Sequence, residues 1–165
     1  MELTSYTNQW AATFQQEKDK LLTLLGIDAF DIQHIGSTAI PGIASKPVVD
    51  IMVLLPSIQN VFKYLDSLHN LGYTHSKERS STERYFFTKG NPVTIHLSLT
   101  DKTTSYWDRQ LAFRDYLLEH PDTAKEYEIL KHSLIERYPS GKDEYSYGKS
   151  EFVAAVLKKA GFVIS

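Results

Sequence analysis

The chain of 165 residues has no cysteine, only two methionines and no long apolar run. Without cysteine, disulfide bonds, thiolate metal sites and cysteine nucleophiles are excluded. The longest apolar run, 48–55, is far shorter than the roughly 20 residues of a membrane-spanning helix, so no membrane partner is expected. Residues 1–10 lack the basic and apolar segments of a secretory signal peptide. These absences favour a cytoplasmic protein.

A strong charge of one sign is also missing, since the net charge is -2 and the pI about 6.3. The molecule as a whole therefore has no electrostatic attraction to nucleic acid or to a membrane surface. Its ten tyrosines could stack on bases, but no basic and aromatic stripe accompanies them. Nucleic acid is thus not the expected partner, and any recognition of phosphate has to be local.

The apolar periodicity predicts helices joined to a group of short strands. We expect helices over 8–25, 57–71, 105–120, 121–138 and 150–160, and strands over 30–35, 48–55, 83–88 and 93–99. Ser57 is expected to cap the second helix, with Val61, Phe62, Leu65 and Leu68 on its core face. A Gly-Asn-Pro turn between the last two strands predicts an antiparallel hairpin.

These elements predict an α+β fold with a mixed β-sheet flanked by helices. We expect one domain over 1–165, with a sheet of four or five strands in 1–100 and a helical portion in 101–165. At this length a single domain can bury a core without disulfides or metals.

One acidic residue, Asp50, interrupts the strand VVDIMVLL at 48–55. Alternation along a strand places Asp50 on one face with Met52, and Val49 and Ile51 on the other. A carboxylate on an apolar face has to be charge-paired, hydrogen-bonded or metal-bound. It is therefore either half of a structural ion pair, with Lys46 or Arg84, or a metal ligand or general base at a site beside the strand.

The turn before this strand, GSTAIPG at 36–42, is rich in small residues and hydroxyls. Backbone amides of Gly36, Ser37 and Thr38 could approach an anion closely, because glycine tolerates the positive φ that such a nest needs. Lys46 could add a point charge to a phosphate. The alternative is an ordinary loop stiffened by its Pro-Gly turn, since no Walker or nucleophile-elbow motif is present.

Other candidate residues lie on a later strand and on the C-terminal helices. In VTIHLSL at 93–99, His96 shares a face with Thr94 and Ser98 and is directed at a polar cleft or into a structural hydrogen bond. His34 carries the same two interpretations. Four basic residues are candidates for contacting negative groups of a ligand, or else for solvated or salt-bridged positions: Arg84, Arg114, Lys131 and Lys149.

With these residues in view, the sequence resembles the GrpB family over nearly its whole length. The resemblance is carried by Tyr6, Trp10, Phe14 and Glu17, by HIGSTAIPG at 34–42 with KPVVDI at 46–51, by LGY at 71–73, RYF at 84–86 and HL at 96–97, and by FRDYL at 113–117, HP at 120–121, Tyr127, LK at 130–131, Tyr145 and Lys149. The resemblance implies the nucleotidyltransferase-like fold of the polymerase-β-like superfamily.

In that superfamily a Gly-Ser turn holds a triphosphate, and paired carboxylates on the following strand hold two metal ions. Gly36, Ser37 and Asp50 match these positions, whereas the second carboxylate is replaced by Met52 and the later strand presents His96 and Ser98. Met cannot bridge hard cations. The resemblance therefore implies at most a single Mg²⁺ or Mn²⁺, held by Asp50 with His96.

We predict a protein that binds a nucleotide or related phosphorylated small molecule and transfers a nucleotidyl group. Asp50 and His96 would be catalytic and metal-binding, and the phosphate contacts would come from Gly36, Ser37, Thr38, Lys46, Arg84, Arg114, Lys131 and Lys149. The first alternative is a binding or accessory module that lost catalysis; because relatives occur fused to dephospho-coenzyme A kinase, its ligand could be related to coenzyme A. The second is a one-metal phosphoesterase that uses His96 and His34 around Asp50.

Overall fold

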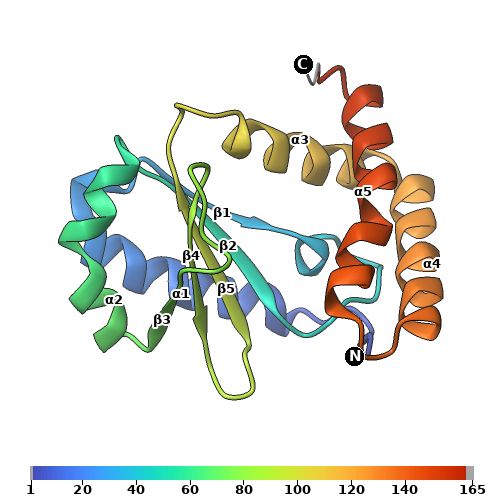
Figure 1. Cartoon of the computed structure of the whole chain (residues 1–165), viewed down its shortest axis with the longest axis horizontal. Helices are drawn as coiled ribbons and strands as arrows, with labels where there is room; N and C mark the ends of the chain where they lie inside the picture. Colours follow the sequence, from blue (N-terminus) through green and yellow to red (C-terminus); the bar gives the residue numbers. More distant parts are fainter. Residues whose placement is uncertain (1, 163–165) are drawn as a thin grey trace.

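A five-stranded mixed sheet lies at the centre of the chain, which a computed structural model describes over residues 2–162 (Figure 1). Its strands are β1 (Asp31–Ile35), β2 (Val49–Leu54), β3 (Tyr73–Ser76), β4 (Tyr85–Lys89) and β5 (Ile95–Thr100), in the order β1-β2-β5-β4-β3. Strands β2 and β5 run parallel, while β1–β2, β5–β4 and β4–β3 are antiparallel. The mixed sheet within the first hundred residues and the β4–β5 hairpin are confirmed.

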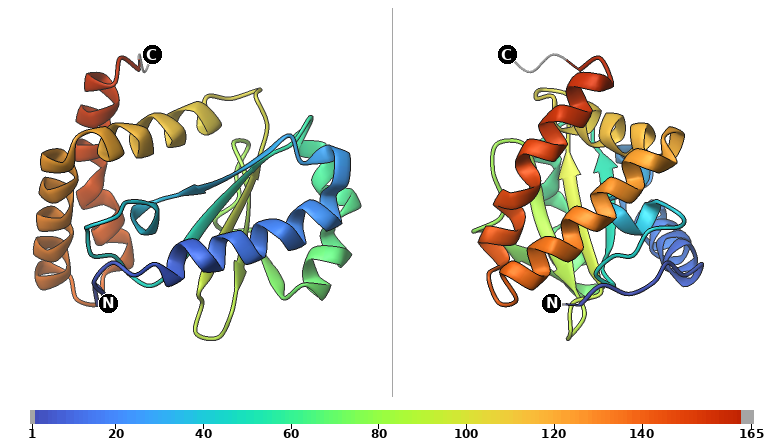
Figure 2. Two further views of the ribbon diagram at one scale, coloured as in Figure 1. Left: turned by 180° about the vertical axis from the view of Figure 1, so that it is seen from behind. Right: turned by 90° about the vertical axis from the view of Figure 1, so that its right-hand side faces the viewer.

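Five α-helices surround this sheet. They are α1 (Gln9–Leu25), α2 (Leu65–Asn70), α3 (Tyr106–Glu119), α4 (Pro121–Arg137) and α5 (Lys142–Lys159), with short 3-10 turns at Gly26–Asp28, Ser37–Ala39 and Ile58–Lys63. Helices α1 and α2 lie together on one side, whereas α4 and α5 pack side by side at the opposite end (Figure 2). The helical C-terminal third is thereby confirmed. Over residues 2–162, no helix is both long and apolar enough to cross a membrane.

The alternation expected for the two central strands is present in the structure. On one face, Val49, Ile51, Leu97 and other apolar side chains of β2 and β5 join α1 and α2 in the largest apolar cluster. On the opposite face, Met52 is fully buried in a smaller cluster that includes Trp107. Asp50 and His96 belong to this second face. The burial of the first face fixes the register, and the register determines where the polar residues of the second face emerge.

Strand β3 and the element after Ser57 differ from the sequence-based expectation. Strand β3 was not predicted, because it is short, lies at a sheet edge and needs apolar residues on one side only. Ser57 does cap the next element, accepting a bond from the Gln59 backbone N–H, but that element is a 3-10 turn followed by the short α2. Phe62, predicted on the core face, is 56% exposed because the tighter turn rotates it away from the core.

Helix α5 begins at Lys142, eight residues before the start predicted at 150. Gly148 lies inside this helix. A Cβ at Gly148 would collide with the Leu134 side chain of α4. Glycine therefore serves here for close helix packing, and the early start brings Tyr145 and Lys149 onto the inner face of α5, where Tyr145 is buried.

A buried carboxylate, Glu17, ties helix α1 to the sheet. Glu17 Oε1 accepts hydrogen bonds from Tyr73 Oη and Lys89 Nζ, each at 2.8 Å, and Lys20 Nζ lies 3.2 Å from Oε2. Burial by itself raises the pKa of Glu17, but the bonds from these three side chains outweigh it and leave the pKa below its ordinary value. Sequentially distant elements α1, β3 and β4 are thus joined at one charged group.

We predict that Glu17→Gln lowers the free energy of unfolding by about 2 kcal/mol, since it leaves the partly buried Lys89 ammonium without its counter-ion. Denaturant unfolding of the purified variant measures this loss. Glu126→Gln, an exposed glutamate on α4, is the matched control and should stay within about 0.5 kcal/mol of the wild type. Equal stability of the two variants would contradict a stabilising role for the Glu17 network.

The same network predicts a pH dependence. A carboxyl group whose pKa is depressed in the folded protein contributes stability above its unfolded pKa, and the contribution is lost as the pH falls through the folded value. The stability difference between wild type and Glu17→Gln should therefore be full at neutral pH and shrink below the ordinary glutamate range. Unfolding curves at a series of acidic pH values test this, and a difference that stays constant would refute it.

Candidate functional site

Asp50 and His96 lie side by side on the polar part of the sheet. They are direct partners in the parallel β2–β5 register, so both side chains leave the sheet on the same face. His96 Nδ1 lies 3.2 Å from Asp50 Oδ1, and the two side chains are 23% and 36% exposed. The pair is within hydrogen-bond distance and open to a ligand.

The Gly36–Ser37 turn lies directly against this carboxylate. Gly36 has φ +74, a conformation that side-chain-bearing residues rarely adopt. A Cβ at this position would also collide with the Asp50 carboxylate. Both constraints require glycine here, and they bring the start of the 3-10 turn Ser37–Ala39 to the strand that carries Asp50.

A cavity of about 650 Å³ opens above the pair, between the sheet, the Gly36 turn and helices α3 to α5. Its size suits a ligand as large as a nucleotide or a drug-sized molecule. Besides Asp50 and His96, the charged side chains that line it are all basic: Lys46, Arg79, Arg84, Arg109, Lys131 and Lys149. We call it the cationic cavity. Its one carboxylate does not balance these charges.

Most of the basic groups have no acidic partner. Arg109 pairs with Glu83. Among residues 2–162, no ion pair joins a carboxylate to the other five, Lys46, Arg79, Arg84, Lys131 and Lys149. The interpretation of Asp50 as half of a structural ion pair with Lys46 or Arg84 is therefore not supported. An excess of unpaired positive charge inside a concave site is what an anionic ligand would neutralise.

Aromatic rings and one carbonyl hold the lysines in place. The ammonium groups of Lys46 and Lys149 lie 4.6 and 4.5 Å from the ring centre of Tyr145. Lys131 lies 5.0 Å from the ring centre of Tyr127 and donates to the Ala44 carbonyl at 2.7 Å. Ring quadrupoles stabilise a cation without neutralising it, so these contacts leave the three lysines, here called the lysine cluster, without a counter-ion.

Burial and mutual repulsion weaken the hold of these lysines on their protons. Burial, followed by the neighbouring charge of Lys149, lowers the pKa of Lys131 to about 7. Burial and the charge of Lys46 lower the pKa of Lys149 to about 8, against the opposing attraction of Asp50. The pKa of Lys46 is also lowered, mainly by burial. An incoming anion would reverse these shifts.

Eight of the ten predicted site residues meet at the cationic cavity: Gly36, Ser37, Lys46, Asp50, Arg84, His96, Lys131 and Lys149. They come from the Gly36 turn and the loop after it, both central strands, the segment before β4, and helices α4 and α5, which are far apart in the sequence. The convergence of the helical portion on the sheet was not visible in the spacing of the residues.

The other two predicted phosphate contacts, Thr38 and Arg114, have structural partners outside the cavity lining. Thr38 is buried, with Oγ1 2.9 Å from His34 Nε2. Arg114 donates to the Gln33 side chain at 2.7 Å and to the His34 carbonyl at 3.0 Å. His34 itself stacks on Phe14, and burial lowers its pKa to about 4. These side chains brace β1 and the turn, and they form no part of the site proposed below.

Sequence reasoning missed Arg79, Arg109, Tyr127 and Tyr145 as lining residues. The two tyrosines were named only among the residues that carry the family resemblance, and that resemblance does not separate a core aromatic from a ring that faces a charged cavity. Arg79 comes from the polar segment 77–84, which has no periodicity to place it.

The donor set does not fit a centre with two metal ions. Met52, at the position of the second carboxylate, is fully buried against apolar side chains. Within the described part of the chain, no group of three or more His, Cys, Asp or Glu side chains is placed to hold a metal. Asp50 alone fits one Mg²⁺ that takes its remaining ligands from phosphate oxygens and water, a common way for proteins to bind this ion.

Solved and curated proteins resemble the chain along most of its length. The crystal structure of GrpB from Enterococcus faecalis superposes with a TM-score of 0.89 at 31% identity and covers 96% of both chains. YqkA from Bacillus subtilis is 35% identical over 97% of this chain, and a Pseudomonas aeruginosa relative is 38% identical over 92%. The chain spans only 47% and 64% of the length of these two relatives.

Two more distant matches are a kinase and a polymerase. A dephospho-CoA kinase from Mycolicibacterium paratuberculosis is 26% identical over 92% of this chain, which spans 44% of the kinase. The poly(U) polymerase Cid1 aligns with 88% of the chain and the chain with 50% of Cid1, at a TM-score of 0.48 and 12% identity, a likeness too remote to bear on function.

The family match agrees with the resemblance carried by the turn and strand motifs. The family model described as "GrpB protein" matches residues 1–159, which is nearly the whole chain and includes every residue that lines the cationic cavity. The chain belongs to the GrpB family.

Proposed function

We propose that the cationic cavity binds the phosphate groups of a nucleotide or a related phosphorylated small molecule. The observation that carries this proposal is the set of five basic side chains without acidic partners around one carboxylate. A phosphate chain supplies several negative charges within a short length, so it can satisfy several of these groups at once. The local positive field arises although the whole chain is slightly acidic.

The lysine cluster and the Gly36 turn would hold the phosphate chain. Lys46 and Lys149 approach the same tyrosine ring, which places two ammonium groups within reach of neighbouring phosphate oxygens. Ser37 lines the cavity beside Asp50, so its backbone N–H would be a further donor, while its hydroxyl bonds to the Tyr127 side chain. Because ring contacts already orient the lysines, little conformational entropy is lost when the ligand binds.

Asp50 would hold one divalent cation, Mg²⁺ or Mn²⁺, that arrives with the phosphates. Such an ion, when bound, would reduce the charge of the phosphates and polarise a phosphorus–oxygen bond. His96, at 3.2 Å from Asp50, would orient the carboxylate, serve as a second ligand or accept a proton from an attacking group. Nucleotidyl transfer, implied by the nucleotidyltransferase-like resemblance, is the reaction this arrangement supports.

Binding without turnover is the second candidate, and Met52 is the observation that favours it. A buried thioether at the second carboxylate position removes one ligand of the usual metal pair. The match to a dephospho-CoA kinase makes a ligand related to coenzyme A one option for such a module. Incubation with labelled nucleoside triphosphates separates the two candidates: released pyrophosphate indicates transfer, whereas retained nucleotide without release indicates a binding module.

One prediction from the proposed function concerns Asp50. Calorimetric titration with ATP should give micromolar to millimolar binding in wild type, strengthened about tenfold by Mg²⁺, whereas in Asp50→Asn the Mg²⁺ effect should disappear. Asp66→Asn, an exposed aspartate on α2, is the matched control and should behave as wild type. No ATP binding by wild type would refute the proposed function, and an unchanged Mg²⁺ effect in Asp50→Asn would refute the metal site.

Another prediction concerns the pH dependence of ligand binding. Bound phosphate favours the charged form of Lys131 and Lys149, so the pKa values of about 7 and about 8 should rise in the complex. Binding near pH 8 should then take up protons, and affinity should fall several-fold between pH 7.5 and pH 9, up to about tenfold per pH unit for each coupled proton. Calorimetry in buffers of different ionisation enthalpy measures the uptake.

Variants of two lysines on α5 provide the control. Lys149→Gln should lower the affinity about tenfold or more, because it removes one phosphate contact. It should also reduce the proton uptake, because it removes one of the two titrating lysines. Lys158→Gln, at an exposed position of the same helix, should leave both unchanged. A wild-type affinity that does not vary with pH in this range would contradict a role for the lysine cluster.

A further inference from the structure

One part of the cationic cavity is not explained by the phosphate chain at the lysine cluster. Arg79 and Arg84 both lie 4.3 Å from the ring centre of Phe86. They come from the segment before β4, whereas the lysine cluster comes from the loop after the Gly36 turn and from α4 and α5. We call these two residues the arginine pair. They are placed on the β4 side of the sheet, beyond β5 as seen from Asp50.

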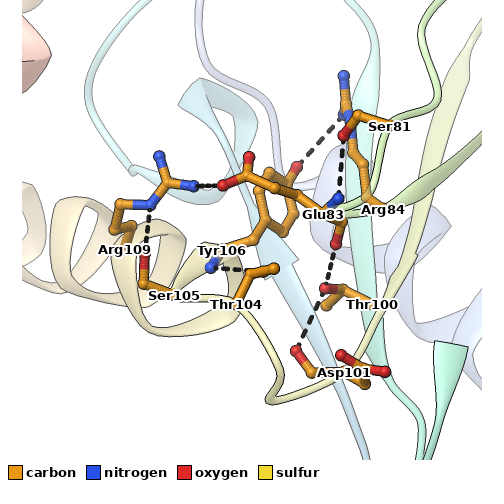
Figure 3. A network of polar contacts seen from close by, with 9 residues as sticks. All are labelled: Ser81, Glu83, Arg84, Thr100, Asp101, Thr104, Ser105, Tyr106 and Arg109. Atoms are coloured by element: carbon orange, nitrogen blue, oxygen red, sulfur yellow. Dashed lines mark hydrogen bonds and ion pairs between the residues drawn. The ribbon is translucent and has the colours of Figure 1, made fainter.

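The Arg84 guanidinium is held by neutral groups alone. It donates to Ser98 Oγ at 3.0 Å and to Tyr106 Oη at 3.2 Å. Figure 3 shows the contrast with Arg109, which is directed at the Glu83 carboxylate on the other side of Tyr106. Two hydroxyls and an aromatic face fix the orientation of Arg84 but leave its charge intact, which is the state of a prepared anion site.

The strand register places this guanidinium apart from the Asp50–His96 pair. Its anchor, Ser98, lies two residues beyond His96 on β5 and pairs with Met52 instead of Asp50. Two residues along a strand span about 7 Å. Among the described residues Arg84 forms no ion pair with Asp50, although both side chains line the cationic cavity. An oxyanion bound to Arg84 would therefore lie in the same cavity as Asp50. Through its bond to Ser98, Arg84 holds a positive charge beside the position of Met52 on β2. The nucleotidyltransferase resemblance implies a metal held by carboxylates close to this position.

We propose that the arginine pair forms a second anion subsite, which binds the phosphate group of a second substrate while the lysine cluster holds the nucleotide. This inference rests on the proposed function for the identity of the first ligand. The planar guanidinium of Arg84 suits two-pronged contact with phosphate oxygens, and Arg79 adds a second charge against the same ring. The class of second substrate is a small phosphate monoester, positioned with its phosphate on the arginine pair and its remainder toward Asp50.

Inorganic phosphate is the probe for this subsite, followed by NMR titration with and without saturating MgATP. We expect phosphate to bind the free protein at two sites and the ATP complex at one. Arg84→Gln should weaken phosphate binding to the ATP complex at least tenfold more than it weakens ATP binding. Arg84→Lys, which keeps the charge but loses the two-pronged contact, should give an intermediate loss. Arg137→Gln, an exposed arginine on α4, should change neither.

Arg79→Gln gives an independent test should Arg84→Gln unfold, and it should weaken phosphate binding to the ATP complex by threefold or more. The inference is overturned if ATP excludes all phosphate, or if Arg84 and Arg79 variants lose ATP and phosphate in equal measure. Should ATP fail to bind, the proposed function fails, yet phosphate titration of Lys149→Gln still decides the second subsite. An Arg84-dependent site that survives in this variant supports it, and the loss of all phosphate binding refutes it.

Discussion

The carboxylate of Asp50, set among basic side chains that outnumber it, is the constraint on which the rest of the site depends. The β2–β5 pairing directs it out of the sheet beside His96, and only a glycine at position 36 allows the preceding turn to lie against it. Its negative charge opposes the loss of protons from Lys46 and Lys149. One acid thus holds together, by attraction, basic groups that repel one another.

The helical third completes the site as well as buttressing the sheet. Two helices, α4 and α5, contribute Lys131 and Lys149 with the aromatic rings on which the lysine cluster rests. Close packing at Gly148 brings the helices together. The desolvation that lowers the lysine pKa values is therefore a consequence of helix packing. Helix packing keeps the lysines buried, where the approach of an anion would stabilise their charged form. Ligand binding and the packing of α5 on α4 should therefore stabilise each other.

Local periodicity accounts for what could be predicted from the sequence. Alternation along two strands was enough to place Asp50 and His96 on one face opposite the core, because side-chain direction in a strand follows position alone. The same reasoning could not place Arg79, which lies in a loop, or separate Thr38, bonded to His34, from the neighbouring Ser37 that lines the cavity. Such distinctions depend on tertiary contacts. The early start of α5 was not predicted, and the packing of its Gly148 against α4 is likewise a tertiary contact.

Next to the Asp50–His96 pair, Met52, Ser98 and Arg84 take the place of a second metal-binding carboxylate. Where two carboxylates would require two metal ions, Met52 is buried and Ser98 binds the Arg84 guanidinium. The positive charge that a second metal ion would supply comes here from the Arg84 guanidinium, which the Ser98 and Tyr106 hydroxyls orient. A fixed guanidinium cannot polarise an oxygen as strongly as a divalent ion, but it needs no metal and recognises the shape of its ligand. If the arginine pair binds a phosphate group as proposed, this exchange would favour selective binding over general phosphoryl activation at that position.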